Sequence, residues 1–169
     1  NISHANLMDL DMLKKLASIK NIKGVKYTAP THFNFSKIKK EISNDFKIYS
    51  GMDEMALSGI MSGADGMIGS FYNLMPEMFV SLFNQLQKGD INEAKKIQEK
   101  INIIIVYALE KSGYPFIKMG MNWLGIDSGY VRRPFVSITD TDVENEIKKD
   151  LKILSKENDL SGIKFLEGL

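Results

Sequence analysis

The chain has 169 residues, the length of a single domain, and its 44% hydrophobic and 25% charged residues are ordinary for a folded globular protein. With 22 basic and 21 acidic residues the net charge is only +1, so composition favours neither nucleic acid nor an anionic membrane as a partner. No cysteine is present, which excludes disulfides, thiolate nucleophiles and cysteine-bound metals, and we expect a cytoplasmic protein.

The chain begins at Asn1, with neither an initiator methionine nor the basic and apolar pattern of a signal peptide. We therefore expect a part of the protein to lie upstream. The most continuous apolar stretch, residues 101–109, is interrupted by Asn102 and is much shorter than the ~20 residues that a membrane-spanning helix needs. The sequence predicts no membrane segment.

The first 70 residues alternate between helix and strand patterns. Apolar residues at helical spacing predict a helix over 7–19, and β-favouring residues predict a strand over 22–28. A helix around 35–42, a strand over 47–51, a helix over 53–61 and a strand within 63–70 follow. This alternation predicts parallel strands joined by helical crossovers.

Only helices are predicted beyond Ser70. A helical stripe over 78–86 leads to Gly89, and Asp90 with Glu93 has the spacing of a capping box that opens a long helix towards Gly113. Shorter helices follow over 118–124 and 143–154, and the lysine-rich end over 148–169 is expected to fray. Three parallel strands followed by helices alone cannot close a barrel, so the predicted sheet is incomplete.

Lys26 is the first candidate for chemistry, because it lies inside an otherwise apolar strand. Strand alternation places Lys26 and Thr28 on one face and Val25 with Tyr27 on the other. If Val25 and Tyr27 pack under helices, Lys26 points into the interior of a barrel, where desolvation favours the neutral, nucleophilic amine. The alternative from spacing alone is a solvated lysine on an exposed edge strand.

Polar residues also follow the other two strands. The block Gly51-Met52-Asp53-Glu54 directly follows the second strand and places two carboxylates in the strand-to-helix turn, where parallel α/β folds assemble active sites. Ser70 ends the third predicted strand. Helix capping is an equally physical role for Asp53 and Ser70, and Glu54 could complement a helix dipole. All three strands nevertheless end in polar groups at the same edge, which favours a site there.

Three separated blocks resemble the lysine-dependent aldolase family of N-acetylneuraminate lyases and dihydrodipicolinate synthases, and within it the lyases. They are Gly24-Val25-Lys26-Tyr27-Thr28, Gly51-Met52-Asp53-Glu54 and the stretch Gly63-Ala64-Asp65-Gly66-Met67-Ile68-Gly69-Ser70-Phe71-Tyr72-Asn73, with Gly89-Asp90 and Arg132-Arg133-Pro134-Phe135 in the same order beyond them. The resemblance implies an α/β fold, the C-terminal part of a (β/α)8 TIM barrel. Residues 1–76 would form strands six to eight with their helices, and residues 77–169 the last barrel helix and a C-terminal helical extension.

The resemblance also implies an activity and its residues. Lys26 would form the Schiff base of an aldolase that cleaves N-acetylneuraminate reversibly to N-acetylmannosamine and pyruvate, without a cofactor. Glu54 discriminates most, because the acidic pair is typical of the lyases, whereas Phe71 departs from the threonine usual after this serine. The residues that would line the pocket and bind the sugar chain are Thr28, Gly51, Asp53, Glu54 and Ser70.

The family's proton-shuttling tyrosine and its carboxylate-binding loop would both lie upstream of Asn1. The implied partners are therefore the N-terminal half of the barrel and the small-molecule substrates, in a homotetramer. Two alternatives stay open: another pyruvate-dependent member of the family, such as dihydrodipicolinate synthase or a sugar-acid aldolase, or an inactive fragment that serves only in association. His4 and His32 have no partner at a metal-ligand spacing, so we expect no metal.

Overall fold

The computed structural model describes residues 9–169, which form two compact units, one ending at Ile68 and the other covering Gly69–Leu169. His4 and the start of the predicted first helix lie outside the described residues. Each unit has its own buried core, and each is described by itself.

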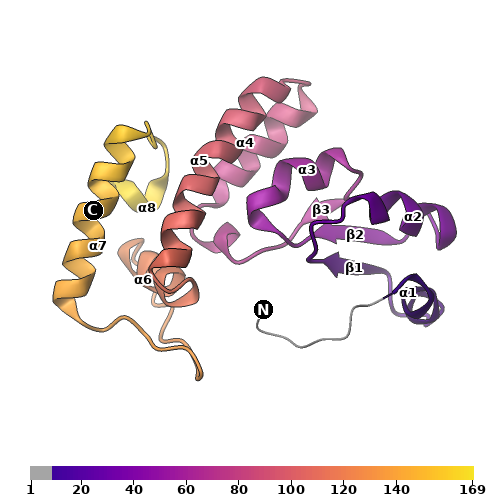
Figure 1. Ribbon diagram of the computed structural model, residues 1–169, viewed down its shortest axis with the longest axis horizontal. Helices are drawn as coiled ribbons and strands as arrows, with labels where there is room; N and C mark the ends of the chain where they lie inside the picture. The colour runs from indigo at the N-terminus through magenta and orange to yellow at the C-terminus, as the bar shows by residue number, and fades with distance from the viewer. Residues whose placement is uncertain (1–8) are drawn as a thin grey trace. The chain divides into compact units, whose positions relative to one another are not determined.

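The first unit alternates helices and strands, as the sequence predicts. Its strands lie side by side in the order β1, β2, β3 and are parallel (Figure 1). Lys26 of β1 is opposite Tyr49 of β2, which is opposite Gly66 of β3. The elements are α1 (Leu10–Ala17), β1 (Gly24–Tyr27), α2 (Phe33–Glu41), β2 (Lys47–Ser50), the 3-10 turn η1 (Asp53–Met55), α3 (Ala56–Met61) and β3 (Gly66–Met67).

One face of this sheet is covered and the other is open. Along β2, Ile48 and Ser50 are buried while Lys47 and Tyr49 are exposed, the alternation of a strand with helices on one side. Val25 and Tyr27 pack against the buried cluster that holds the helices on the sheet. That cluster consists of Leu13 of α1, Phe35 and Ile38 of α2, Phe46, and Ile48 of β2.

Asp65 joins the strands to α2 at the end of the sheet opposite the predicted site. Its carboxylate accepts hydrogen bonds from Lys39 Nζ at 2.6 Å, from the Ile48 amide at 2.8 Å and from Lys47 Nζ at 3.2 Å. Lys39 also donates to the carbonyl of Phe46 at 2.9 Å. Burial alone raises the pKa of Asp65, but these three donors outweigh it and lower that pKa to about 2.

We expect Asp65→Asn to lower the free energy of unfolding by about 1–2 kcal/mol at neutral pH, since it removes charge-assisted hydrogen bonds. Because the folded pKa lies below the ordinary value of 3.8, this stabilisation is complete above pH 4 and is lost as the pH falls towards 2. Urea unfolding of the complete protein at pH 7 and pH 2.5, with exposed Asp45→Asn as control, measures the effect. If the difference in free energy of unfolding between Asp65→Asn and the parent is the same at both pH values, the prediction is wrong.

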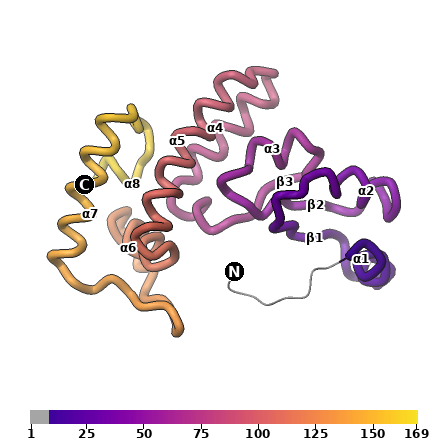
Figure 2. The backbone as a smooth tube through the Cα atoms, viewed as in Figure 1, coloured from indigo at the N-terminus to yellow at the C-terminus, as the bar shows by residue number. Residues whose placement is uncertain are grey.

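The second unit is helical apart from its loops. In it α4 and α5 run alongside each other, as the backbone trace shows (Figure 2). Its elements are the 3-10 turn η2 (Phe71–Asn73), α4 (Pro76–Gln87), α5 (Ile91–Glu110), α6 (Tyr114–Trp123), α7 (Thr141–Glu157) and α8 (Lys164–Glu167). No helix within residues 9–169 combines the length and apolar character needed to cross a membrane.

Only half of the predicted capping box forms at the start of α5. The Asp90 carboxylate accepts from the Glu93 amide at 3.0 Å, which satisfies one of the free amides of the first turn. The Glu93 carboxylate instead pairs with Lys96 at 3.1 Å, one turn along the helix. The amide of Asp90 donates to the carbonyl of Gln85, so it does not need the reciprocal bond.

The expectation of a frayed C-terminal end is wrong, because tertiary contacts hold it. α7 continues to Glu157, and Leu160, Ile163 and Phe165 beyond it are each at most 1% exposed. The Phe165 ring stacks on the Trp123 indole at a centroid distance of 6.4 Å. Burial of these apolar side chains outweighs the low helix propensity of the short segments that carry them.

Candidate active site

Lys26 and Thr28 lie on the face of the sheet opposite to the helices, as strand alternation predicts. Both are exposed, whereas Val25 and Tyr27 between them are partly buried against the helical side. In a closed barrel this face is the interior. Within the first unit it carries a shallow hollow of about 210 Å³ lined by Lys23, Gly24, Val25, Lys26, Lys47 and Tyr49.

The exposure of Lys26 differs from the desolvated lysine that the sequence predicts. In the described part of the chain β1 pairs only with β2, so it is an edge strand and nothing in the first unit covers the Lys26 side chain. In these three strands Lys26 is therefore an exposed lysine on an edge strand, which is the alternative that its spacing left open. Lys26 nevertheless lies on the face of the sheet that a closed barrel would enclose.

Gly51 touches both of these residues from the neighbouring strand. Its amide donates to the Tyr27 carbonyl at 2.9 Å, which extends the ladder between β1 and β2 by one step. A β-carbon at Gly51 would overlap Oγ1 of Thr28 and lie 2.9 Å from Cε and 3.1 Å from Cγ of Lys26. The lysine side chain thus lies directly over the glycine backbone, and only glycine leaves that space.

Asp53 and Glu54 follow Gly51 in the turn between β2 and α3, as the sequence predicts, but they differ in environment. Asp53 is 6% exposed and takes part in further interactions, whereas Glu54 is exposed. Asp53 is the first residue of η1. Met52 and Met55 occupy the N-cap positions of η1 and α3, and neither makes a side-chain cap bond.

Ser70 falls in the second unit, whereas Lys26, Thr28 and Gly51 belong to the first. It occupies the N-cap position of η2, yet its side chain makes no cap bond there. Its carbonyl accepts from the side-chain amide of Asn73 at 3.0 Å. The hydroxyl of Ser70 therefore has no role in capping, and substrate binding by Ser70 stays a prediction.

Sequence reasoning missed the burial of His32, because a lone histidine in a loop carries no periodic signal. His32 is 7% exposed, directly precedes α2, and stacks on Phe35 at a centroid distance of 4.9 Å. Its Nδ1 lies 3.3 Å from Oγ of Ser58 on α3. Residues 9–169 contain no group of three His, Cys, Asp or Glu side chains placed to hold a metal ion.

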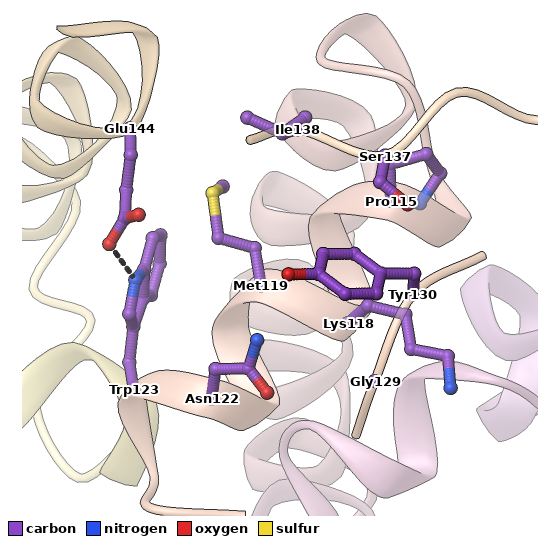
Figure 3. A pocket seen from close by; sticks show the side chains of 10 residues that line it. All are labelled: Pro115, Lys118, Met119, Asn122, Trp123, Gly129, Tyr130, Ser137, Ile138 and Glu144. Carbon is purple, nitrogen blue, oxygen red and sulfur yellow. Dashed lines mark hydrogen bonds between the residues drawn. The ribbon is translucent and has the colours of Figure 1, made fainter. Parts of the chain in front are cut away.

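A second hollow, of about 70 Å³, lies in the second unit between α6, α7 and the loop that joins them (Figure 3). On one wall the Trp123 indole donates to Glu144 at 2.8 Å, as the dashed line in Figure 3 shows. Lys148 pairs with the same carboxylate at 2.7 Å and lies over the indole ring. These contacts hold α6 against α7.

Known structures with the same fold match most of this chain. An N-acetylneuraminate lyase from Fusobacterium nucleatum, solved with pyruvate, is 33% identical with a TM-score of 0.74 over 85% of this chain and 49% of its own. A catalytic lysine mutant of the sialic acid aldolase from Ruminococcus gnavus is 27% identical, with a TM-score of 0.75 over 89% of this chain and 51% of its own.

A dihydrodipicolinate synthase from Bacillus anthracis has the same fold, with 21% identity and a TM-score of 0.73 over 86% of this chain and 48% of its own. This chain thus spans about half the length of the structures that it matches. The prediction of a partial TIM barrel is confirmed. Residues 3–154 also match the model of the dihydrodipicolinate synthetase family. The chain therefore belongs to this family of TIM-barrel proteins.

Proposed function

We propose that this chain supplies the imine-forming part of an N-acetylneuraminate lyase, which cleaves N-acetylneuraminate reversibly to N-acetylmannosamine and pyruvate. The observation that carries the proposal is the contact of Lys26 and Thr28 with the bare backbone of Gly51, two residues before Asp53 and Glu54. The 33% identity to a lyase solved with pyruvate supports the same assignment.

The proposed reaction begins at the Lys26 amine, which adds to the C2 ketone of the open-chain substrate. Loss of water leaves a protonated imine, and this cation accepts the electron pair of the breaking C3–C4 bond. The proton of the C4 hydroxyl leaves at the same step, so N-acetylmannosamine departs as the aldehyde and an enamine stays on Lys26. Protonation of the enamine carbon and addition of water to the imine release pyruvate and restore the amine.

The remaining site residues have binding roles in this proposal. Thr28 presents its hydroxyl beside Lys26, and Asp53 and Glu54 accept hydrogen bonds from the hydroxyl groups of the sugar chain. Ser70, three residues after β3, donates to the substrate. The group that takes the C4 proton belongs to the other part of the barrel, which residues 1–76 complete as strands six to eight and residues 77–169 follow as a helical extension.

Glu54→Ala tests the substrate assignment. We expect about a tenfold to hundredfold fall in kcat/KM for N-acetylneuraminate, because a hydrogen bond to a charged group contributes about 1.5–3 kcal/mol. Pyruvate has no hydroxylated tail, so borohydride trapping of its imine should be unchanged. The control is Asp45→Ala, which removes an exposed carboxylate before the opposite end of β2.

Two results would redirect the assignment. Equal losses of cleavage and of pyruvate trapping in Glu54→Ala would make Glu54 a structural residue. Trapping of pyruvate without cleavage of N-acetylneuraminate would point to another pyruvate-dependent reaction of the family, such as that of a dihydrodipicolinate synthase. The homotetramer and the cytoplasmic location stay predictions, to be checked by sedimentation and by fractionation of cells.

A further inference from the structure

His32 lies in the loop that carries Thr28 away from β1, at the entry to α2. Its ring stacks on Phe35 with an interplanar angle of 27°, and both side chains are buried, so the orientation of the imidazole is fixed by packing. The edge of the ring that carries Nδ1 faces Ser58 of α3 at 3.3 Å. This contact joins two segments that each follow a strand of the candidate active site.

The hydroxyl of Ser58 also lies 3.1 Å from the Met55 carbonyl. Its single hydrogen is donated either to that carbonyl, with Nδ1 of His32 as the donor to Ser58, or to Nδ1 in the other tautomer of His32. Nε2 is buried and has no hydrogen-bond partner among the residues that the structure describes. The Nδ1 bond is thus the polar contact that anchors the ring.

Close packing beneath this contact leaves little freedom to α3. A β-carbon at Gly59, next to Ser58, would lie 2.6 Å from Cβ of Ser50 and 3.8 Å from Cε1 of His32. The backbone of α3 therefore lies directly on the last residue of β2. Ser50 itself is 1% exposed and directly precedes Gly51, over which the Lys26 side chain lies.

We propose that His32 is a positioning residue for the sugar-binding part of the active site, acting through its hydrogen bond to Ser58. The bond ties the loop after Lys26 and Thr28 to the helix that follows Asp53 and Glu54. It thereby fixes the separation between the imine-forming lysine and the carboxylate pair. This inference rests on the proposed function and extends it by a residue that does not touch substrate.

The consequence is selective for substrates that reach both groups. Pyruvate contacts only the imine-forming end, so its addition to Lys26 does not depend on where α3 lies. A nine-carbon sugar acid must meet Lys26 and the carboxylate pair at once, and a displaced helix costs binding at the distant end. Loss of the bond should therefore raise KM for N-acetylneuraminate and leave pyruvate trapping unchanged.

The test compares two serines with the same local bond. The hydroxyls of Ser58 and Ser36 both lie within hydrogen-bond distance of the carbonyl three residues earlier in the chain, at 3.1 Å and 2.9 Å, but of the two only Ser58 also shares a hydrogen bond with His32. Ser58→Ala and His32→Phe, which keeps an aromatic ring on Phe35, are compared with Ser36→Ala. His32→Asn, which keeps an amide in the place of Nδ1, is the rescue variant. All are measured in the complete enzyme that contains this chain.

We expect Ser58→Ala and His32→Phe each to lower kcat/KM for N-acetylneuraminate about threefold to tenfold through KM, the range of one neutral hydrogen bond. The kcat/KM of the double variant should be no lower than that of the less active single variant, because both substitutions remove the same bond. His32→Asn should recover most of the loss, and Ser36→Ala should show none.

Two different failures can be told apart. If pyruvate is trapped normally but Ser58→Ala behaves like Ser36→Ala, or if the two single effects add in the double variant, the positioning role is wrong. A fall in pyruvate trapping that matches the fall in cleavage would show a general structural role and also overturn it. If the unaltered enzyme traps no pyruvate at all, the proposed function is wrong, and the positioning role falls with it.

Discussion

Lys26→Arg should abolish the borohydride-trapped pyruvate adduct and lower cleavage of N-acetylneuraminate by a factor on the order of a thousand or more. Arginine keeps the positive charge and much of the length of the side chain, but its guanidinium cannot lose a proton to become a nucleophile. The loss would thus report chemistry at Nζ rather than loss of charge at the open face of the sheet.

The matched control for this substitution is Lys23→Arg. Lys23 lines the same hollow and is also exposed, but it precedes β1 instead of lying within it. Peptide mapping after reduction should find the pyruvate adduct on Lys26 and none on Lys23. If Lys26→Arg still forms a pyruvate adduct on another lysine, Lys26 is not the imine-forming residue and the proposed mechanism is wrong.

Residues 1–169 alone should give neither cooperative unfolding nor pyruvate release. In the described chain β1 and β3 each pair only with β2, so both edges of the sheet present unpaired backbone groups. Tyr49 and Ile68, at 36% and 44% exposure, add apolar surface to this unit. We expect self-association of the isolated chain, and cooperative unfolding with activity only when a second polypeptide supplies the first five strands.

Sedimentation, thermal unfolding and pyruvate release, each with and without the complementing polypeptide, measure this. The complementing polypeptide measured alone, without this chain, separates complementation of the fold from any activity of the complement itself. A monomeric, cooperatively folded and active species of 19.1 kDa, formed by this chain alone, would show that the three strands are sufficient.

The parts of the fold that local pattern determines could be predicted from the sequence. The period-two alternation around Lys26 predicted its face correctly, because Val25 and Tyr27 have apolar partners on the helices. The order of helices and strands and the cap at Asp90 are equally local. The predicted strand within 63–70 shrinks to Gly66–Met67, because only Tyr49 and Ser50 of β2 are opposite it.

Features that depend on contacts between distant residues could not be predicted. The ordered C-terminal end follows from the packing of Phe165 on Trp123, which no window of sequence contains. The predicted helix over 53–61 begins as a 3-10 turn, and Asp53, the first residue of that turn, is buried. The burial of His32 depends on its contacts with Phe35 of α2 and Ser58 of α3, and its signal in the sequence is a single residue.

The bare backbone at Gly51 sets limits on how the specificity of this site could be redesigned. Every side chain at this position would displace the lysine beside it, so Gly51 should be kept constant in any library of variants. Glu54, three residues later and exposed, has no such restriction and is the position to randomise. Selection for aldehydes of different length should therefore accumulate changes at Glu54 while the glycine stays invariant.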